Sequence, residues 1–365
     1  MDFELSDEQK DVQKAAREFA QGEFDPDLAL ELDQKGKFPE SIWKKASQLG
    51  FIGIHYPEEF GGQGLGIFEN LLVIEAFCRV DSGIGSALST VDLGSEVILK
   101  FGSHEQKNQF LTPLTKGEKQ LGIALGESED GRDLTDISTI AERKVDEYYS
   151  IHGKKSFVLN VSLADSFVTL CKEPKEGWIT LIVEREKEGI EVHPVDKMGL
   201  RMIPFGDLLF KEVLLTHVDH CYQAIGLKSA AQALGTAQGA FNRAMQYAKQ
   251  REQFGRKLSQ FQAIRHKLAD IAVSIEVVRC LTYKAATEFD HKKIDPGFLS
   301  ITQLEVGRRL VAIVDEALQI FGGYGYISEQ AIEHYFRDAW AIGVELGTEE
   351  EQKDLIAEIM LGPFQ

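Results

Sequence analysis

The sequence is poor in cysteine, poor in basic residues and free of long hydrophobic runs. Its cysteines are far apart and form no CxxC pair, so we expect free thiols in a reducing compartment: Cys78, Cys171, Cys221 and Cys280. No apolar stretch reaches the roughly 18 residues that a membrane-spanning helix needs. The N-terminal residues MDFELSDEQK lack the cationic and then apolar order of a secretory signal. These absences predict a cytoplasmic protein without membrane insertion.

Acidic residues outnumber basic ones: 58 Asp and Glu stand against 40 Lys and Arg, which gives a net charge of -18. This excess argues against nucleic acid or an anionic membrane as a partner, because phosphate groups are repelled overall. A local basic patch for one anionic cofactor is compatible with it. We expect no metal site, because the histidines show no metal-ligand spacing. Among the nine histidines, those considered are His55, His104, His193, His217, His220, His266 and His334.

The order of hydrophobic patterns along the 365 residues predicts three domains of an α+β fold. Residues 1–120 read as helices that prolines interrupt, and residues 121–219 contain short strand-like runs such as SFVTLC and WITLIV. In residues 220–365 the apolar residues return to helical spacing, which predicts a bundle. Because strands and helices are segregated rather than alternating, a doubly wound NAD-binding fold is disfavoured.

Three long motifs resemble those of the acyl-CoA dehydrogenase family. They are MGLRMIPFGDLLFKEVLL, YAKQREQFGRKLSQFQAIRHKLADIA and ALQIFGGYGYISEQAIEHYFRDA, and they occur in the family's order. The resemblance covers essentially the whole chain. It implies an N-terminal helical domain, a middle β domain and a C-terminal four-helix bundle, assembled as tetramers with FAD.

The resemblance also implies the reaction. In this family a carboxylate removes the α-proton of an acyl-CoA thioester while hydride leaves the β-carbon for the flavin, and an electron-transfer flavoprotein is the expected electron acceptor. The α-proton of a thioester is very weakly acidic. The site therefore needs fixed donors that polarise the carbonyl group and a desolvated carboxylate beside the α-carbon.

The adenine half of the implied FAD site is well kept. The resemblance assigns the pyrophosphate and adenine of a neighbouring subunit's FAD to Arg251, Gln253, Phe254, Gln319, Gly322 and Gly323. Arginine supplies a permanently charged planar fork for phosphate, and glycine lets the backbone approach the cofactor closely. Taken singly, these residues are also typical of a protein surface and of a helix C-cap. The presence of both motifs, one around Arg251 and one around Gly322, in the family's order favours cofactor binding.

The flavin-ring half departs from the family pattern. The segment GESEDGRD places Gly126 where the family has a threonine, Ser128 at a proline and Arg132 at a serine. The family's W-I-T strand becomes Phe157-Val158-Leu159, which keeps an aromatic ring but loses a second hydroxyl. The Gly-Thr pair near the C-terminus is kept, so Thr348 joins the expected cofactor residues.

The catalytic base is the sharpest departure. Leu346 occupies the position of the usual glutamate, and Glu345 comes one residue earlier, an offset that turns a helical side chain by about 100°. Asp92 is another candidate, because members that act on cyclic substrates can carry an aspartate base there. Both carboxylates have a plainer interpretation, Asp92 as a helix cap or solvated group and Glu345 as a solvated loop residue. The alternative base region CYQAIGLKSAAQALG has no carboxylate.

These patterns leave three hypotheses, of which the first is preferred. The chain is a subunit of an α2β2 acyl-CoA dehydrogenase that lends the adenine half of an FAD site to a homologous partner, because the losses concentrate on the ring side. The second is a homo-oligomeric enzyme with Glu345 or Asp92 as a relocated base for a cyclic or bulky acyl-CoA. The third is a non-catalytic acyl-CoA-binding or structural partner.

Overall fold

The computed structural model describes residues 4–127, 137–144, 149–175, 177–215, 217–218 and 223–362. The expectations for Ser128, Arg132, His220 and Cys221 concern residues outside these ranges. Helices, then strands, then helices follow one another along the chain, so the α+β fold class is confirmed. The boundaries at 120 and 219 stay predictions. No described helix is both long and apolar enough to cross a membrane.

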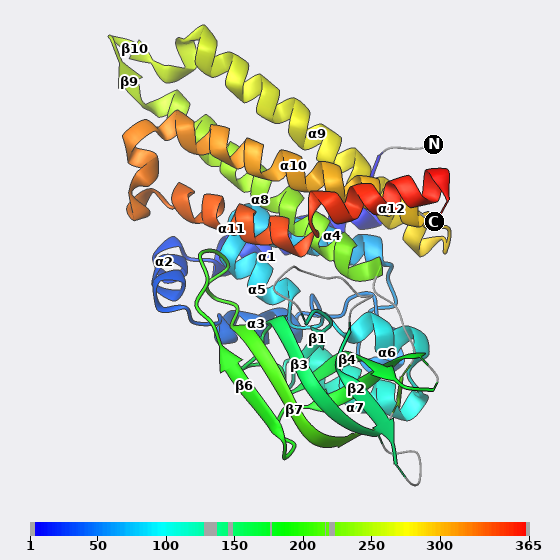
Figure 1. Cartoon of the computed structure of the whole chain (residues 1–365). Helices are drawn as coiled ribbons and strands as arrows, with labels where there is room; N and C mark the ends of the chain where they lie inside the picture. The colour runs from blue at the N-terminus through cyan, green and yellow to red at the C-terminus, as the bar shows by residue number, and fades with distance from the viewer. Residues whose placement is uncertain are drawn as a thin grey trace.

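Of the N-terminal helices, those of residues 7–23, 67–80 and 82–89 lie in the middle of the molecule, whereas those of residues 95–101 and 104–115 lie beside the sheet (Figure 1). Ser6 begins the first of them with a capping box that includes Gln9. Helices α4 and α5 are almost wholly buried, because their apolar residues face neighbours on all sides. The elements are α1 (Asp7–Glu23), α2 (Pro26–Lys35), α3 (Glu40–Gln48), η1 (Glu58–Phe60), α4 (Ile67–Val80), α5 (Ser82–Ser89), α6 (Ser95–Phe101) and α7 (His104–Thr115).

The middle domain is a sheet in the order β6-β7-β3-β2-β4-β5-β8, with β1 beside β4. Most pairs are antiparallel, and β4 pairs in parallel with β1 and β2. Its own core includes Phe167 and Phe210. The strands are β1 (Leu121–Ala124), β2 (Ile140–Arg143), β3 (Tyr149–Leu159), β4 (Ser166–Glu173), β5 (Gly177–Glu184), β6 (Ile190–Pro194), β7 (Phe205–Leu215) and β8 (His217–Val218).

The C-terminal helices pack side by side in the half of the molecule opposite the sheet, and the loop between β6 and β7 reaches up to them (Figure 1). The predicted apolar spacing is confirmed, since Ile271, Ile275, Val306, Leu310 and Ile313 are buried. A short hairpin projects from one end of the bundle. The elements are α8 (Gln223–Gln250), β9 (Glu252–Gln253), β10 (Arg256–Lys257), η4 (Leu258–Gln260), α9 (Gln262–Asp290), α10 (Pro296–Phe321), η5 (Gly322–Tyr326), η6 (Ser328–Gln330), α11 (Ile332–Glu345) and α12 (Glu349–Leu361).

A buried carboxylate on α11 joins the three parts of the fold. Asp338 accepts hydrogen bonds from the Ser82 hydroxyl of α5 at 2.5 Å and from the Leu200 N–H, in the loop between β6 and β7, at 2.6 Å. The adjacent Arg337 bonds to Asp33 of α2 at 2.7 Å and to the Met198 carbonyl oxygen at 3.0 Å. These bonds seat the β6–β7 loop against α11. We call Arg337 and Asp338 the α11 clamp.

Replacing Asp338 with alanine is expected to lower the free energy of unfolding by about 2 to 5 kcal/mol, because the Ser82 hydroxyl and the Leu200 N–H would remain buried without an acceptor. Urea unfolding followed by circular dichroism measures the change. Asp354→Ala, on the exposed face of α12, is the matched control and should leave the midpoint unchanged. Equal midpoints for the two variants would contradict the role of the clamp.

Candidate functional site

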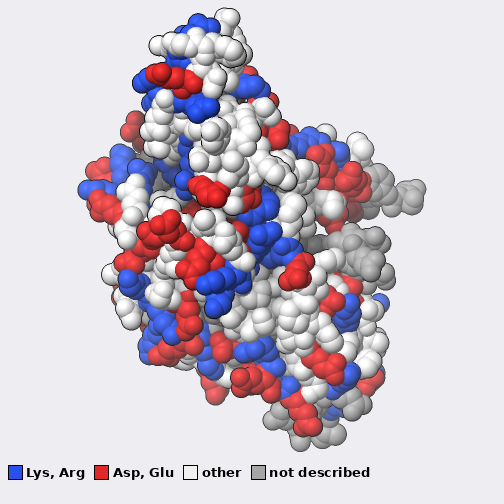
Figure 2. Space-filling model, turned by 90° about the vertical axis from the view of Figure 1, so that its left-hand side faces the viewer, with Lys and Arg blue, Asp and Glu red and all other residues white. Residues whose placement is uncertain are grey.

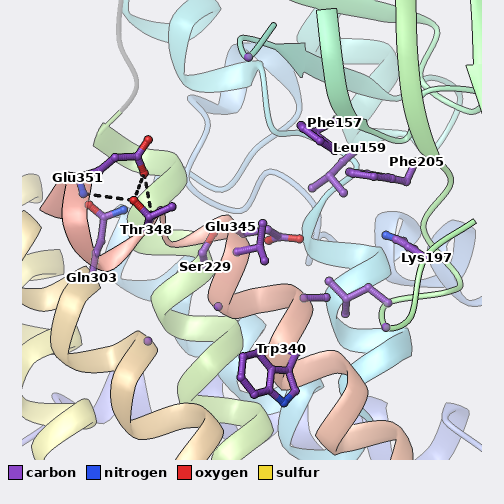
Figure 3. A pocket seen from close by; sticks show the side chains of 18 of the residues that line it. Phe157, Leu159, Lys197, Phe205, Ser229, Gln303, Trp340, Glu345, Thr348 and Glu351 are labelled. Carbon is purple, nitrogen blue, oxygen red and sulfur yellow. Dashed lines mark hydrogen bonds between the residues drawn. The ribbon is translucent and has the colours of Figure 1, made fainter. Parts of the chain in front are cut away.

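A cavity of about 870 Å³ lies between the β domain and the C-terminal bundle. The β domain supplies Gly126, Phe157 and Leu159 to its wall, while α10, α11 and the start of α12 supply the opposite side (Figure 3). Most of the lining is apolar, with a few polar side chains among it. A concave, largely apolar space with few polar groups is the usual form of a small-molecule site.

The predicted flavin-ring residues lie together in this cavity. Phe157 sits at an irregularity in the pairing of β3 with β7 and has a positive φ of 58°, which turns its ring outward. The ring is 50% exposed and stacks on Phe205 at a centroid distance of 5.7 Å. Gly126 and Leu159 line the same cavity and supply no hydroxyl. The aromatic wall is therefore kept, while the two side-chain donors of the family pattern are absent.

The end of α11 decides which of its last residues reaches the cavity. Glu345 is the final helical residue, and its carboxylate points into the cavity (Figure 3). Leu346 follows as the C-cap, is only 1% exposed and packs near Gly307 of α10. The helix continues to this point, so the one-residue offset rotates the two side chains by about 100°. The carboxylate at position 345 thus enters the space, whereas the leucine at the expected base position belongs to the core.

Thr348 lines the cavity as the N-cap of α12. Its hydroxyl accepts a hydrogen bond from the Glu351 N–H at 3.2 Å, and Glu351 bonds back to the Thr348 N–H at 2.7 Å. This capping box satisfies the first turn of α12. The carbonyl oxygen of Leu346 accepts from the amides of Gln303 at 3.4 Å and Gln352 at 3.1 Å. The chain between α11 and α12 is therefore held in place at the cavity wall.

Asp92 lies behind the wall of the cavity. Its carboxylate accepts from the Lys228 ammonium at 2.9 Å and from the Tyr56 hydroxyl at 2.9 Å, and all three residues are buried. The next residue, Leu93, lines the cavity instead. Lys228 was not singled out from the sequence, because the pairing joins residues 136 positions apart. The structure thus separates Asp92 from Glu345, although both were candidate bases.

Lys197 is a lining residue that sequence reasoning missed. It stands in the β6–β7 loop, and Figure 3 shows its ammonium pointing toward the Glu345 carboxylate. Burial lowers the pKa of Lys197 to about 8, although the negative charges of Glu345 and Asp338 oppose this shift. The available signal was a lone lysine directly before the MGLR motif. A loop residue has no periodicity that would have revealed its direction.

The predicted adenine-side residues gather at the other end of the bundle, where α8 leads into the β9–β10 hairpin and α10 ends (Figure 1). The Arg251 guanidinium lies 5.0 Å from the ring centroid of Tyr324, which joins the two segments. Phe254 is 92% exposed, in a hairpin whose tip carries basic side chains (Figure 2). A β-carbon added at Gly322 or Gly323 would meet no atom within 4 Å. Gln253 and Gln319 are also exposed.

Family models for the N-terminal, middle and C-terminal domains of acyl-CoA dehydrogenases match residues 6–118, 122–213 and 227–361. The chain belongs to the acyl-CoA dehydrogenase family. Its members are flavin-dependent oxidoreductases that use FAD, and this is the reaction class and the cofactor of the protein.

Relatives and solved structures agree over nearly the full length. The chain is 35% identical to a 3-(aryl)acrylate reductase of Clostridium sporogenes, with 96% of this chain and 97% of the relative covered. It is 32% identical to the caffeyl-CoA reductase-Etf complex subunit CarC of Acetobacterium woodii, with 98% and 99% covered. The butyryl-CoA dehydrogenase structure from Megasphaera elsdenii superposes with a TM-score of 0.92 at 31% identity and covers 99% of this chain and 100% of that one.

The residues present in this acyl-CoA dehydrogenase fit FAD at both ends. The half-buried Arg251 offers a fixed positive charge for pyrophosphate in a chain that is negative overall, and the open backbone at Gly322 and Gly323 leaves room for an extended ligand. At the cavity, the exposed Phe157 ring offers a flat apolar surface. The two ends are far apart. Val311 lines the cavity, and Gly322 comes eleven residues later, about 16 Å along α10 at 1.5 Å per residue.

Arg251→Ala is expected to weaken FAD retention about tenfold or more, because a charge-assisted contact to phosphate is lost, while the unfolding midpoint of the apoprotein changes little. Flavin absorbance after gel filtration and dilution measures retention. Lys249→Ala, an exposed change on the last turn of α8, is the control and should keep wild-type flavin content. Full flavin content in the Arg251 variant would count against its assignment to the cofactor.

Proposed function

We propose that this acyl-CoA dehydrogenase is a subunit of an α2β2 assembly and contributes the adenine half of an interfacial FAD site to a homologous partner chain. The separation of the exposed adenine-side cluster from the chain's own cavity carries the proposal. An FAD gripped at the hairpin end of the bundle extends into a neighbouring chain. The losses at Gly126, Leu159 and Leu346 support a partner that owns the complete ring half.

The proposed reaction is the α,β-dehydrogenation of an acyl-CoA thioester, or its reverse. FAD supplies the hydride exchange when bound. The protein's tasks are to hold the thioester, to exclude water with the apolar walls of the cavity and to move the α-proton to a carboxylate. The names of the arylacrylate and caffeyl-CoA reductase relatives favour an aromatic acyl group, in keeping with aromatic acid rather than fatty acid metabolism.

The relative from Acetobacterium woodii is named as a subunit of a reductase-Etf complex. We therefore extend the proposal to an electron-transfer flavoprotein as the electron acceptor or donor of this chain. A cytoplasmic location belongs to the same proposal. It is supported by the thiols of Cys78, Cys171 and Cys280, which the described structure leaves unpaired.

A second candidate is a homo-oligomeric enzyme in which Glu345 is the relocated base. One observation favours it: the Glu345 carboxylate enters the cavity although the expected position, Leu346, is buried in the core. Asp92 receives less support as a base, because the Lys228 ammonium and the Tyr56 hydroxyl already hold its carboxylate. The two candidates differ in which chain completes the FAD site. In the first it is a homologous partner chain, and in the second it is another copy of this chain.

Flavin stoichiometry separates the candidates. For the α2β2 assembly, the chain purified alone is expected to be nearly colourless and prone to aggregation, and co-expression with the homologous partner should give a heterotetramer with two FAD. Native mass spectrometry and flavin absorbance measure both states. A stable homotetramer of this chain with one FAD per subunit and turnover of an acyl-CoA would overturn the heteromer and support the second candidate.

The reaction rates of variants that lack one carboxylate also separate the two candidates. If this chain's cavity is catalytic, Glu345→Gln should lower the rate about 10²- to 10⁴-fold, the usual cost of losing a general base. In the α2β2 assembly the same change should alter the rate by no more than a few-fold. Asp92→Asn is the companion variant, and its first effect should be on stability, because it strands the buried Lys228. A large rate loss at unchanged stability would instead identify Asp92 as the base.

A further inference from the structure

The ammonium of Lys197 is buried in the cavity wall, and none of the described residues accepts a hydrogen bond from it. Its Nζ lies 5.3 Å from the ring centroid of Phe205, which attracts a cation but has no acceptor oxygen. A buried charged donor without an acceptor costs free energy. The position therefore suits a ligand that brings an acceptor atom to this wall.

The charges around Lys197 restrict what that acceptor is. Glu345 on α11 faces Lys197, and Asp338, two turns earlier on the same helix, already accepts two hydrogen bonds (Figure 3). On the remaining walls Arg308 of α10 pairs with Glu349 at 2.7 Å, and Glu351 caps α12. A second carboxylate beside Glu345 would be repelled. A neutral carbonyl oxygen is the acceptor that fits between the opposite charges.

Main-chain donors near the end of α11 are already engaged. The Leu346 N–H donates to the Ile342 carbonyl oxygen at 3.2 Å, and the Gly347 N–H donates to the Val344 carbonyl oxygen at 3.2 Å. The family position for a flavin-side hydroxyl is Gly126, which has no side chain to donate. A side-chain donor could polarise a carbonyl group beside Glu345, and Lys197 faces that carboxylate (Figure 3).

We propose that Lys197 is a catalytic residue of this cavity, whose ammonium donates a hydrogen bond to the thioester oxygen of a bound acyl-CoA. The proposal rests on the second candidate function, in which this chain's own cavity is catalytic, because the α2β2 arrangement assigns the base to the partner chain. With Glu345 as base, the Cα–H bond breaks, the proton goes to the Glu345 carboxylate and the electron pair moves onto the thioester oxygen as an enolate. The negative charge thus moves from the Glu345 carboxylate to the thioester oxygen. The Lys197 ammonium is close to both groups in this arrangement and stabilises the charge throughout the step.

The test is a binding comparison of two ligands that differ in one oxygen. Cinnamoyl-CoA carries the thioester carbonyl, whereas its thioether, S-(3-phenylprop-2-enyl)-CoA, lacks it, and neither is turned over by the oxidised enzyme. Lys197→Met should raise the Kd of cinnamoyl-CoA about tenfold or more and leave that of the thioether unchanged, because only the charged hydrogen bond is removed. Calorimetry on the FAD-loaded homo-oligomer of this chain measures both constants, and a chain that purifies without FAD would contradict the inference together with the second candidate. Lys197→Arg keeps the charge and should keep a preference for the thioester.

The preference should also depend on pH. Because burial lowers the pKa of Lys197 to about 8, the ammonium is present below that pH, and the thioester preference should fade as the pH rises through it. The preference of Lys197→Arg should persist, since arginine stays protonated. This readout distinguishes a charged donor from a lysine that only shapes the cavity.

Two results would overturn the proposed role of Lys197 without contradicting the proposed acyl-CoA function. One is an equal change, or no change, in the affinities for both ligands in Lys197→Met. The other is loss of FAD from that variant with an unaltered thioester preference, which would assign the ammonium to the cofactor. If the wild-type protein binds neither ligand, the proposed acyl-CoA function fails together with the inference, so the two failures are distinguishable.

Discussion

The buried Asp338 on α11 is the contact on which the site depends. It has exchanged water for two hydrogen bonds, one from α5 and one from the β6–β7 loop, and burial raises its pKa. The neighbouring Arg337 ties the same loop and α2 to the same helix. The loop approaches α11 closely at Gly199. A β-carbon at this position would lie 2.1 Å from the Arg337 carbonyl oxygen, so a residue with a side chain would push the loop away. The MGLR and RDA motifs are therefore the two sides of one contact.

This contact also sets the chemistry of the cavity. Lys197 precedes the clamped loop residues, and Glu345 lies two turns beyond Asp338 on the clamped helix. A shift of the loop along α11 would change the separation of the ammonium and the carboxylate. The arrangement of opposite charges in an apolar cavity is thus a consequence of how the β domain docks on the bundle. A helix positions the carboxylate, and a loop held by hydrogen bonds to that helix positions the ammonium.

The two ends of the implied FAD site differ in burial and in the kinds of side chain that they present. At the hairpin end, Phe254 is almost fully exposed, and the half-buried Arg251 lies beside the Tyr324 ring of the same chain. At the cavity end, the lost hydroxyls at Gly126 and Leu159 leave the walls well packed and apolar. A carboxylate and a lysine remain among those walls. This contrast is the basis of the proposal that the two ends serve different subunits.

The sequence by itself determined the fold class, the order of the domains and the family. Each of these depends on periodicity and on motifs of local residues, such as the apolar spacing that buries Ile271 and Val306. It also indicated the adenine-side cluster, whose residues stand in two contiguous motifs. Only the tertiary structure decided which carboxylate enters the cavity, because the direction of Glu345 depends on where α11 ends. The pairing of Asp92 with Lys228 and the approach of Lys197 to Glu345 likewise join distant segments, and no local pattern encodes such contacts.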